Sequence, residues 1–213
     1  MLVIAAVAAS TFGLAMSAGV AQAASPTASS AKPSRVRAVD PMAAVATAAL
    51  TELREYIRSG ASSTLAAYEG ERAEIADVVA IRLVLDPAQI NAAWSAADLD
   101  HQVALMAAFT QLGVPYHTNM SKAGVGFDCS GLTTYAWGIA GQTLTRQSAA
   151  QIRKAAPRTA ATAMAGDLVY YPGHVMLYLG VANAIVHAPY TGRGVEVDMI
   201  AHHRSVRYGD PDA

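Results

Sequence analysis

One cysteine and two histidines are the residues of this chain whose types and spacing indicate chemistry. Cys129 is the only cysteine among the 213 residues, and His174 and His187 follow it. A cysteine without a partner in its own chain is buried and inert, pairs with another molecule, or is a reactive thiol. A thiol attacks a carbonyl as the thiolate, and an imidazole can take its proton. The three residues therefore suggest a nucleophile, a base and a group that orients the base.

The sequence around Cys129 predicts that the cysteine lies at the start of a helix. Asp128 is a good N-cap, and residues 129–137 read as a helix with Leu132 and Tyr135 on one face. Free backbone N–H groups and the helix dipole favour negative charge in the first turn. We therefore expect this position to lower the pKa of the Cys129 thiol. The same amides are suited to receive the oxyanion of a tetrahedral intermediate.

The two histidines are predicted to lie in one β-hairpin. Residues 174–179 and 184–187 read as short strands rich in β-branched and aromatic side chains. A tight turn between them puts His187 opposite Met176, and side chains alternate between the faces of a sheet. His174 and His187 then share one face as diagonal neighbours, so that one ring can orient the other. A slip of one residue in this register would separate the two rings.

The same residues have other readings. An isolated cysteine is most often a small buried apolar residue, and a histidine near a strand end is more often structural than catalytic. The three side chains could also bind zinc. They lack the close ligand spacing of common zinc sites, and no acidic residue is near either histidine in sequence. We therefore expect no metal at these residues.

Helix signals dominate residues 40–94, which we predict to form a small α-helical region. Asp40-Pro41 and Asp86-Pro87 each place an N-cap aspartate before a proline at the first helical position. Gly60 is predicted to end the first helix, and a second helix is expected at about 64–85. Residues 95–98 fit a capping box that opens another helix, which ends at Gly113.

Strand signals dominate the part of the chain that follows. Short runs rich in β-branched and aromatic residues are separated by Gly, Pro or Asn. These runs are 167–171, 174–179, 184–187 and 195–197. Helices followed by consecutive short strands predict the α+β class. Residues 155–164 read as a linker.

The beginning of the chain predicts export. Residues 1–20 are uncharged and mostly apolar, and Ala21-Gln22-Ala23 fits a cleavage site, so we predict a signal peptide at 1–23. Polar residues inside the apolar run disfavour a membrane anchor. Residues 24–39 read as a flexible linker rich in Ser and Pro. The net charge of −1 argues against a nucleic-acid partner.

Several short strings in the second half resemble the NlpC/P60 domain, a group of papain-like cysteine peptidases that cut peptidoglycan stem peptides. The matching strings are Leu112-Gly113-Val114-Pro115-Tyr116, Gly126-Phe127-Asp128-Cys129-Ser130-Gly131-Leu132, Arg146-Gln147-Ser148, Ala165-Gly166-Asp167-Leu168-Val169, His174-Val175 and His187-Ala188-Pro189. The resemblance implies a catalytic domain at 95–213, with helices packed on an antiparallel sheet.

The resemblance also implies roles for individual residues. Cys129 would be the nucleophile, His174 the general base and His187 the residue that orients it. Substrate would be contacted by Tyr116, Asp128 and Ser130. The implied protein is a cell-wall hydrolase without a cofactor, which cuts between D-γ-glutamate and the following diamino acid, often diaminopimelate. Together with the predicted signal peptide, this leads us to expect a secreted protein, and we expect it to be a monomer.

One departure from the family pattern leaves alternatives open. Members usually follow the Pro-Tyr pair with x-Trp-Gly-Gly, whereas residues 117–120 here are His-Thr-Asn-Met. This change alters a wall of the expected substrate groove and keeps a non-catalytic peptidoglycan-binding or division-partner module as an alternative. An amidase or acyltransferase would use the same residues. Residues 40–94 would dock on the catalytic domain, bind a cell-wall or division protein, or shield the active site.

Overall fold

A computed structural model describes residues 40–202 and 204–213. The predicted signal peptide and linker lie outside the described residues. Within the described part, no helix combines the length and the apolar character needed to cross a membrane.

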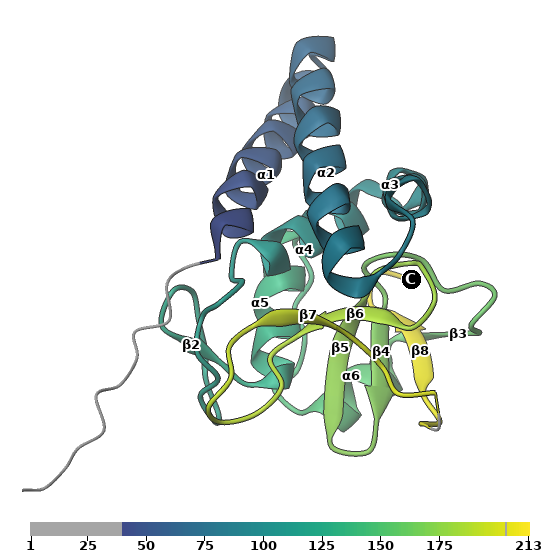
Figure 1. The fold of residues 1–213 in the computed structure, drawn as a ribbon. Coiled ribbons are helices and arrows are strands. Elements are labelled where there is room, and N and C mark those ends of the chain that lie inside the picture. The colour runs from purple at the N-terminus through teal and green to yellow at the C-terminus, as the bar shows by residue number, and fades with distance from the viewer. Residues whose placement is uncertain (1–39, 203) are drawn as a thin grey trace, which may run out of the picture. The chain divides into compact units, whose positions relative to one another are not determined.

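Three helices form the first described segment. The first two lie side by side and run in opposite directions (Figure 1), and the third follows a short connection. Their bounds are α1 (Pro41–Ser59), α2 (Ser62–Leu83) and α3 (Pro87–Ala96).

The predicted starts of α1 and α3 and the predicted end of α1 are confirmed, whereas α2 begins and ends two residues before the expected range of about 64–85. The Asp40 carboxylate accepts a hydrogen bond from the backbone N–H of Met42 at 3.0 Å, and Asp86 caps α3 through Ala88 in the same way at 2.9 Å. Gly60 ends α1 with a positive φ of 68°, a conformation that glycine adopts without steric cost.

The predicted start of the next helix is wrong. Helix α4 (Leu99–Phe109) has Asp98 as its N-cap residue, and the Asp98 side chain makes no capping hydrogen bond. Ser95, the expected cap, lies inside α3, because the helix that starts at Pro87 continues past it. Helix α4 is buried from His101 to Phe109 and runs through the centre of the described unit.

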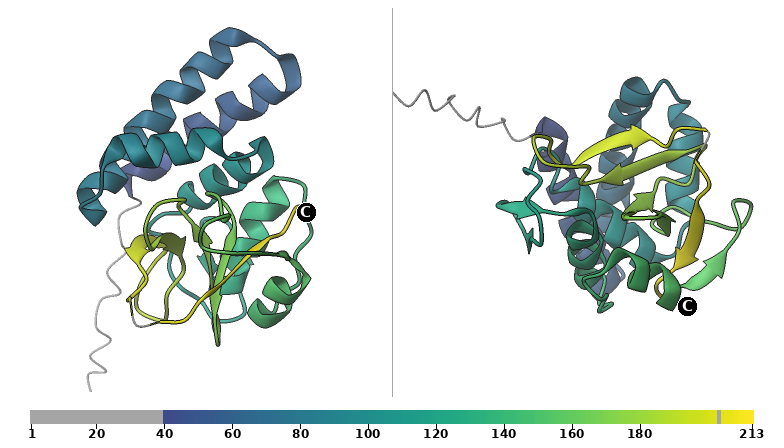
Figure 2. Two further views of the ribbon diagram at one scale, coloured as in Figure 1. Left: turned by 90° about the vertical axis from the view of Figure 1, so that its right-hand side faces the viewer. Right: turned by 90° about the horizontal axis from the view of Figure 1, so that it is seen from below.

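A six-stranded antiparallel sheet completes the fold, in the order β3-β8-β4-β5-β6-β7 (Figure 1). Its strands are β3 (Ala156–Arg158), β4 (Leu168–Tyr171), β5 (His174–Tyr178), β6 (Ala184–His187), β7 (Glu196–Met199) and β8 (Arg207–Asp210). A separate pair consists of β1 (Ser121–Lys122) and β2 (Gly126–Phe127). Helices α5 (Cys129–Ile139) and α6 (Ser148–Lys154) also contact the sheet (Figure 2). The predicted α+β class, with helices packed on an antiparallel sheet, is confirmed.

The register of the β5–β6 hairpin is the one that the sequence predicted. Leu177 pairs with Val186, and Tyr178 pairs with Ile185. Alternation then sends Leu177 and Val186 into the main core, while Ile185 joins a smaller apolar cluster with Met176. His174 and His187 fall on the same side as that smaller cluster.

Two strands of the six-stranded sheet were missed, as were both strands of the separate β1–β2 pair. The segment read as a linker contains β3, which is an edge strand, and β8 lies between β3 and β4. Both strands are short, and β8 reads Arg-Tyr-Gly-Asp, with no run of apolar residues. Their place in the sheet depends on pairing with distant strands, which a local pattern does not reveal.

The apolar core is continuous from the first helices to the sheet. Buried side chains of α1, α2 and α3 belong to the same cluster as those of α4, α5, β5 and β6. The Trp94 side chain of α3 donates a hydrogen bond to the carbonyl of Leu179, which directly follows β5, at 2.9 Å. Residues 40–94 therefore share their core with the sheet.

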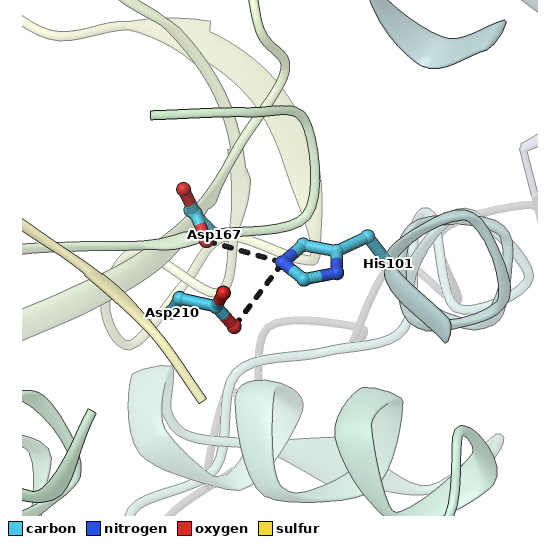
Figure 3. A group of neighbouring side chains, drawn as sticks. All are labelled: His101, Asp167 and Asp210. Carbon is cyan, nitrogen blue, oxygen red and sulfur yellow. Dashed lines mark hydrogen bonds and ion pairs between the residues drawn. The ribbon is translucent and has the colours of Figure 1, made fainter. Parts of the chain in front are cut away.

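A buried polar cluster also ties α4 to the sheet (Figure 3). Nε2 of His101 lies 3.2 Å from a carboxylate oxygen of Asp167 and 3.4 Å from one of Asp210. Arg158 pairs with the other oxygen of Asp210 at 2.5 Å. Burial alone would lower the pKa of His101, but the bond to Asp167 and the charge of Asp210 raise that pKa above its ordinary value.

Candidate active site

Cys129 is the first residue of α5, as predicted. Asp128 is the N-cap residue, and its carboxylate accepts a hydrogen bond from the backbone N–H of Gly131 at 2.6 Å. This bond satisfies one of the free amides of the first turn. Cys129 therefore begins a capped helix, and its side chain is partly buried.

Two glycines let the chain approach closely around this turn. A Cβ atom on Gly131 would lie 1.9 Å from the carbonyl oxygen of Met120, and one on Gly126 would lie 2.3 Å from the ring of His117. Both distances are far inside van der Waals contact. The loop before the cysteine can pack onto the start of α5 only because these positions lack side chains.

The Cys129 thiol does not have the lowered pKa that the sequence predicted. Burial raises its pKa above the ordinary value, and the charge of Asp128 acts in the same direction. Hydrogen bonds from the backbone amides of Val175 and Ser130 oppose this shift without overcoming it. The contact with Val175 also places the thiol one residue along β5 from His174.

The two histidines lie in direct contact. Nε2 of His174 is 2.9 Å from Nδ1 of His187, and the rings meet nearly edge to face. Each residue is only 8% exposed. Burial, the neighbouring His187 and the charge of Arg204 lower the pKa of His174 to about 4.

These pKa shifts leave both His174 and Cys129 uncharged at neutral pH. His174 is an uncharged imidazole that can accept a proton, and Cys129 is a thiol that can give one up. Since Nε2 of His174 is engaged by His187, its Nδ1 nitrogen is left to receive that proton. The arrangement suits general-base activation of a thiol during attack, rather than a preformed thiolate–imidazolium pair.

Two tyrosines lie close to residues of the site. Tyr116 forms an isolated β-bridge with Phe127, two residues before Cys129, and Tyr171 pairs with His174 across β4 and β5. The Tyr171 ring also packs against the His174 ring, with centroids 5.3 Å apart. The Cζ atom of Arg204 lies over the Tyr171 ring, 4.4 Å from its centroid. The structure thus brings Tyr116 to the site and adds Tyr171, which the sequence did not suggest.

Asp128 and Ser130 are both held by Arg146. The Arg146 guanidinium pairs with the Asp128 carboxylate at 2.8 Å, and the Ser130 hydroxyl donates to the Arg146 carbonyl at 2.7 Å. Both residues are buried. Their contact with substrate stays a prediction, and the bonds to Arg146 give each of them a structural role at the start of α5.

An acidic residue that was not predicted from the sequence lies next to His187, on the side away from His174. Glu196 pairs with His187 across β6 and β7, and its carboxylate lies 3.7 Å from Nε2 of His187. The segment 195–197 was expected to be a strand, but its partner strand was not predicted. Extending the hairpin register to a third strand would have revealed the pair.

Comparison with known proteins identifies the domain that carries this site. Residues 113–208 match the sequence profile of the NlpC/P60 family. The chain contains an NlpC/P60 domain. The resemblance noted in the sequence is therefore confirmed, and the matched range includes Cys129, His174 and His187.

Several curated proteins are similar to this chain across that domain. A probable endopeptidase of Corynebacterium glutamicum (strain R) is 31% identical over 131 residues, which are 59% of this chain and 61% of the relative. The peptidoglycan endopeptidase RipA of Mycolicibacterium smegmatis is 32% identical over 43% of this chain and 21% of its own. A γ-D-glutamyl-L-lysine dipeptidyl-peptidase of Bacillus cereus is 33% identical over a match that covers 40% of this chain and 28% of the relative. The chain thus spans less than two thirds of the length of each.

Solved structures of NlpC/P60 domains are also similar to the second half of the chain. One is RipD of Mycobacterium tuberculosis, described as a non-catalytic NlpC/P60 domain protein adapted to peptidoglycan binding. It is 28% identical with a TM-score of 0.44, and the match covers 53% of this chain and 96% of RipD.

Proposed function

We propose that this protein is a secreted hydrolase that cuts peptidoglycan stem peptides with Cys129 as its nucleophile. The proposal rests mainly on one observation, the 2.9 Å contact between two buried histidines. The first of them, His174, precedes Val175, whose backbone N–H bonds the Cys129 thiol. Relatives named as endopeptidases and as a γ-D-glutamyl dipeptidyl-peptidase support this chemistry. The bond we propose joins D-γ-glutamate to the following diamino acid, diaminopimelate.

The proposed reaction is acyl transfer through a thioester. His174 accepts the thiol proton as the Cys129 sulfur attacks the γ-glutamyl carbonyl carbon. Backbone amides at the start of α5 stabilise the negative charge on the carbonyl oxygen. His174 then gives its proton to the leaving amine, the C–N bond breaks, and a thioester remains. Water, deprotonated by His174, hydrolyses that thioester and restores the thiol.

His187 is proposed to orient the base. Its Nδ1 atom accepts a hydrogen bond from Nε2–H of His174, which fixes the ring and leaves Nδ1 of His174 unprotonated. Tyr116, which forms a β-bridge with Phe127 just before the nucleophile, is proposed to line the substrate groove. Exposed apolar side chains at the end of α2, Ile81 and Val84, support a second proposal, that a cell-wall protein docks on the helical region.

Mass spectrometry of stem-peptide digests tests the proposal. Tripeptides and tetrapeptides are incubated with residues 24–213 and, in parallel, with the Cys129→Ala variant. We expect fragments split after D-glutamate from the wild-type protein and none from the variant. Bound but uncut peptide with both proteins would instead support the non-catalytic module, and cleavage of another amide would support an amidase.

A further inference from the structure

Nε2 of His187 is a buried polar atom that lacks a hydrogen-bond partner among the described residues. Its nearest charged neighbours are two carboxylates of β7. One oxygen of Glu196 lies 3.7 Å away, and one oxygen of Asp198 lies 3.9 Å away. Both distances are slightly longer than a hydrogen bond. A small side-chain rotation would bring either carboxylate into contact.

The proton on His187 decides whether His174 can act as a base. The two rings share one hydrogen between Nε2 of His174 and Nδ1 of His187. If His187 carries its proton on Nε2, the Nδ1 atom of His187 accepts a hydrogen bond from Nε2–H of His174. The Nδ1 atom of His174 is then unprotonated and can take the thiol proton. If His187 instead carries its proton on Nδ1, it donates the hydrogen bond to Nε2 of His174, and His174 holds its own proton on Nδ1. Only the first tautomer is active.

Glu196 is better placed than Asp198 to select the active tautomer. The β6–β7 register pairs Glu196 directly with His187, and its side chain is 13% exposed, compared with 48% for Asp198. Arg193 fixes the carboxylate with contacts of 2.5 and 3.1 Å. Burial alone would raise the pKa of Glu196, but the neighbouring His187 and Arg193 bring that pKa below its ordinary value. The carboxylate is therefore anionic and can only accept.

We propose that Glu196 is a positioning residue that accepts a hydrogen bond from Nε2–H of His187 and so holds the histidine pair in its active tautomer. The inference rests on the proposed function of Cys129 and His174, and it adds a fourth residue behind them. The same trio of His187, Glu196 and Asp198 is close enough to hold a cation. The guanidinium of Arg193 forms an ion pair with the Glu196 oxygen nearest His187, so the charge of this carboxylate is already balanced by a protein cation, although that oxygen has no hydrogen-bond partner among the described residues.

The test combines kinetics with a direct measurement of the tautomer. The variants are Glu196→Ala and, as the matched control on the same strand, Asp198→Asn. We expect Glu196→Ala to lower kcat for stem tetrapeptide on the order of tenfold or more, with little change in KM, because a positioning group acts on the base and not on substrate binding. Asp198→Asn should stay near wild type. In a His187→Asn background, which removes Nε2, Glu196→Ala should have no further effect.

Nitrogen-15 NMR of the histidine rings separates this inference from the proposed function. In wild-type protein, His187 should show a protonated Nε2 and an unprotonated Nδ1, and Glu196→Ala should shift the population towards the other tautomer. This readout does not depend on turnover, so an inactive wild-type protein would refute the peptidase and still test Glu196. An unchanged His187 tautomer in Glu196→Ala, or an equal loss of kcat in the His187→Asn background, would overturn the inference.

Discussion

Nε2 of His174 lies 2.9 Å from Nδ1 of His187, and neither nitrogen faces solvent. One histidine therefore orients the other by a single buried hydrogen bond. The bond requires an acceptor at the second position, and it does not require that acceptor to be charged.

Replacing His187 should reveal its role as an acceptor. His187→Ala removes the acceptor, and we expect a large loss of kcat. The loss should be smaller than that of His174→Ala, which removes the base and should lower kcat about 100-fold or more. His187→Asn offers an amide oxygen in the same region, so it should retain more activity than His187→Ala. Equal losses in the two variants, measured by steady-state kinetics with matched thermal stability, would show that only the shape of His187 matters.

The pKa of His174 predicts the acidic limb of the pH profile. The base must be neutral to take the thiol proton, and its pKa of about 4 keeps it neutral well below pH 6. Activity should therefore fall only as the pH approaches about 4. The charge of Arg204 contributes to this low pKa, so Arg204→Met should move the acidic limb of kcat/KM to higher pH. Arg204→Lys keeps the charge and is the control. If the acidic limb of kcat/KM lies at the same pH in the wild-type protein and both variants, this electrostatic account is contradicted.

Two glycines of α5 make a matched pair for the packing at the nucleophile. Gly131→Ala would place a methyl group 1.9 Å from the Met120 carbonyl oxygen, so we expect loss of stability and displacement of the loop before Cys129. Gly138 has open space around it, and Gly138→Ala should stabilise the helix by about 0.5–1 kcal/mol. Chemical denaturation measures both. A wild-type stability for Gly131→Ala would mean that the close contact is not required.

The buried cluster of His101, Asp167 and Asp210 should make stability depend on pH. The folded-state pKa of His101 is raised above its unfolded value of about 6.5. Its contribution is therefore fully present below about pH 6.5 and is lost as the pH rises through the folded pKa. Removing one member of such a buried group costs about 3–5 kcal/mol, because the remaining charges lose their partner.

His101→Ala is the variant that tests this cluster, with the exposed His202→Ala as its control. The free energy of unfolding should drop strongly in His101→Ala at pH 6 and by less at pH 8.5. His202→Ala should change little at either pH. A loss in His101→Ala that is the same at both pH values would show that packing, and not the charge, dominates.

Local signals could be predicted from the sequence, and contacts between distant strands could not. The Asp128 cap, the ends of α1 and the β5–β6 register each depend on neighbours within a few residues. Glu196 was missed because its relation to His187 needs the register of a further strand. The misplaced cap at Ser95 shows how an upstream helix start can override a good local motif.

Predicting the charge state of the site also required the folded structure. A helix start favours a thiolate, which is why the sequence predicted a lowered pKa for Cys129. Burial of the thiol reverses that effect, and burial depends on the packing of β5 against α5. A helix dipole is visible in a sequence, whereas desolvation is not.

Trapping the acyl-enzyme tests the central claim most directly. Wild-type protein is mixed with stem tetrapeptide, quenched in acid within its first turnovers, and analysed by intact-mass and peptide-mapping mass spectrometry. We predict an acyl adduct of the γ-glutamyl fragment on Cys129, absent from Cys129→Ala and accumulating more slowly in His174→Ala. Peptide products formed without any adduct on Cys129, or formed equally by Cys129→Ala, would contradict thiol catalysis at this site.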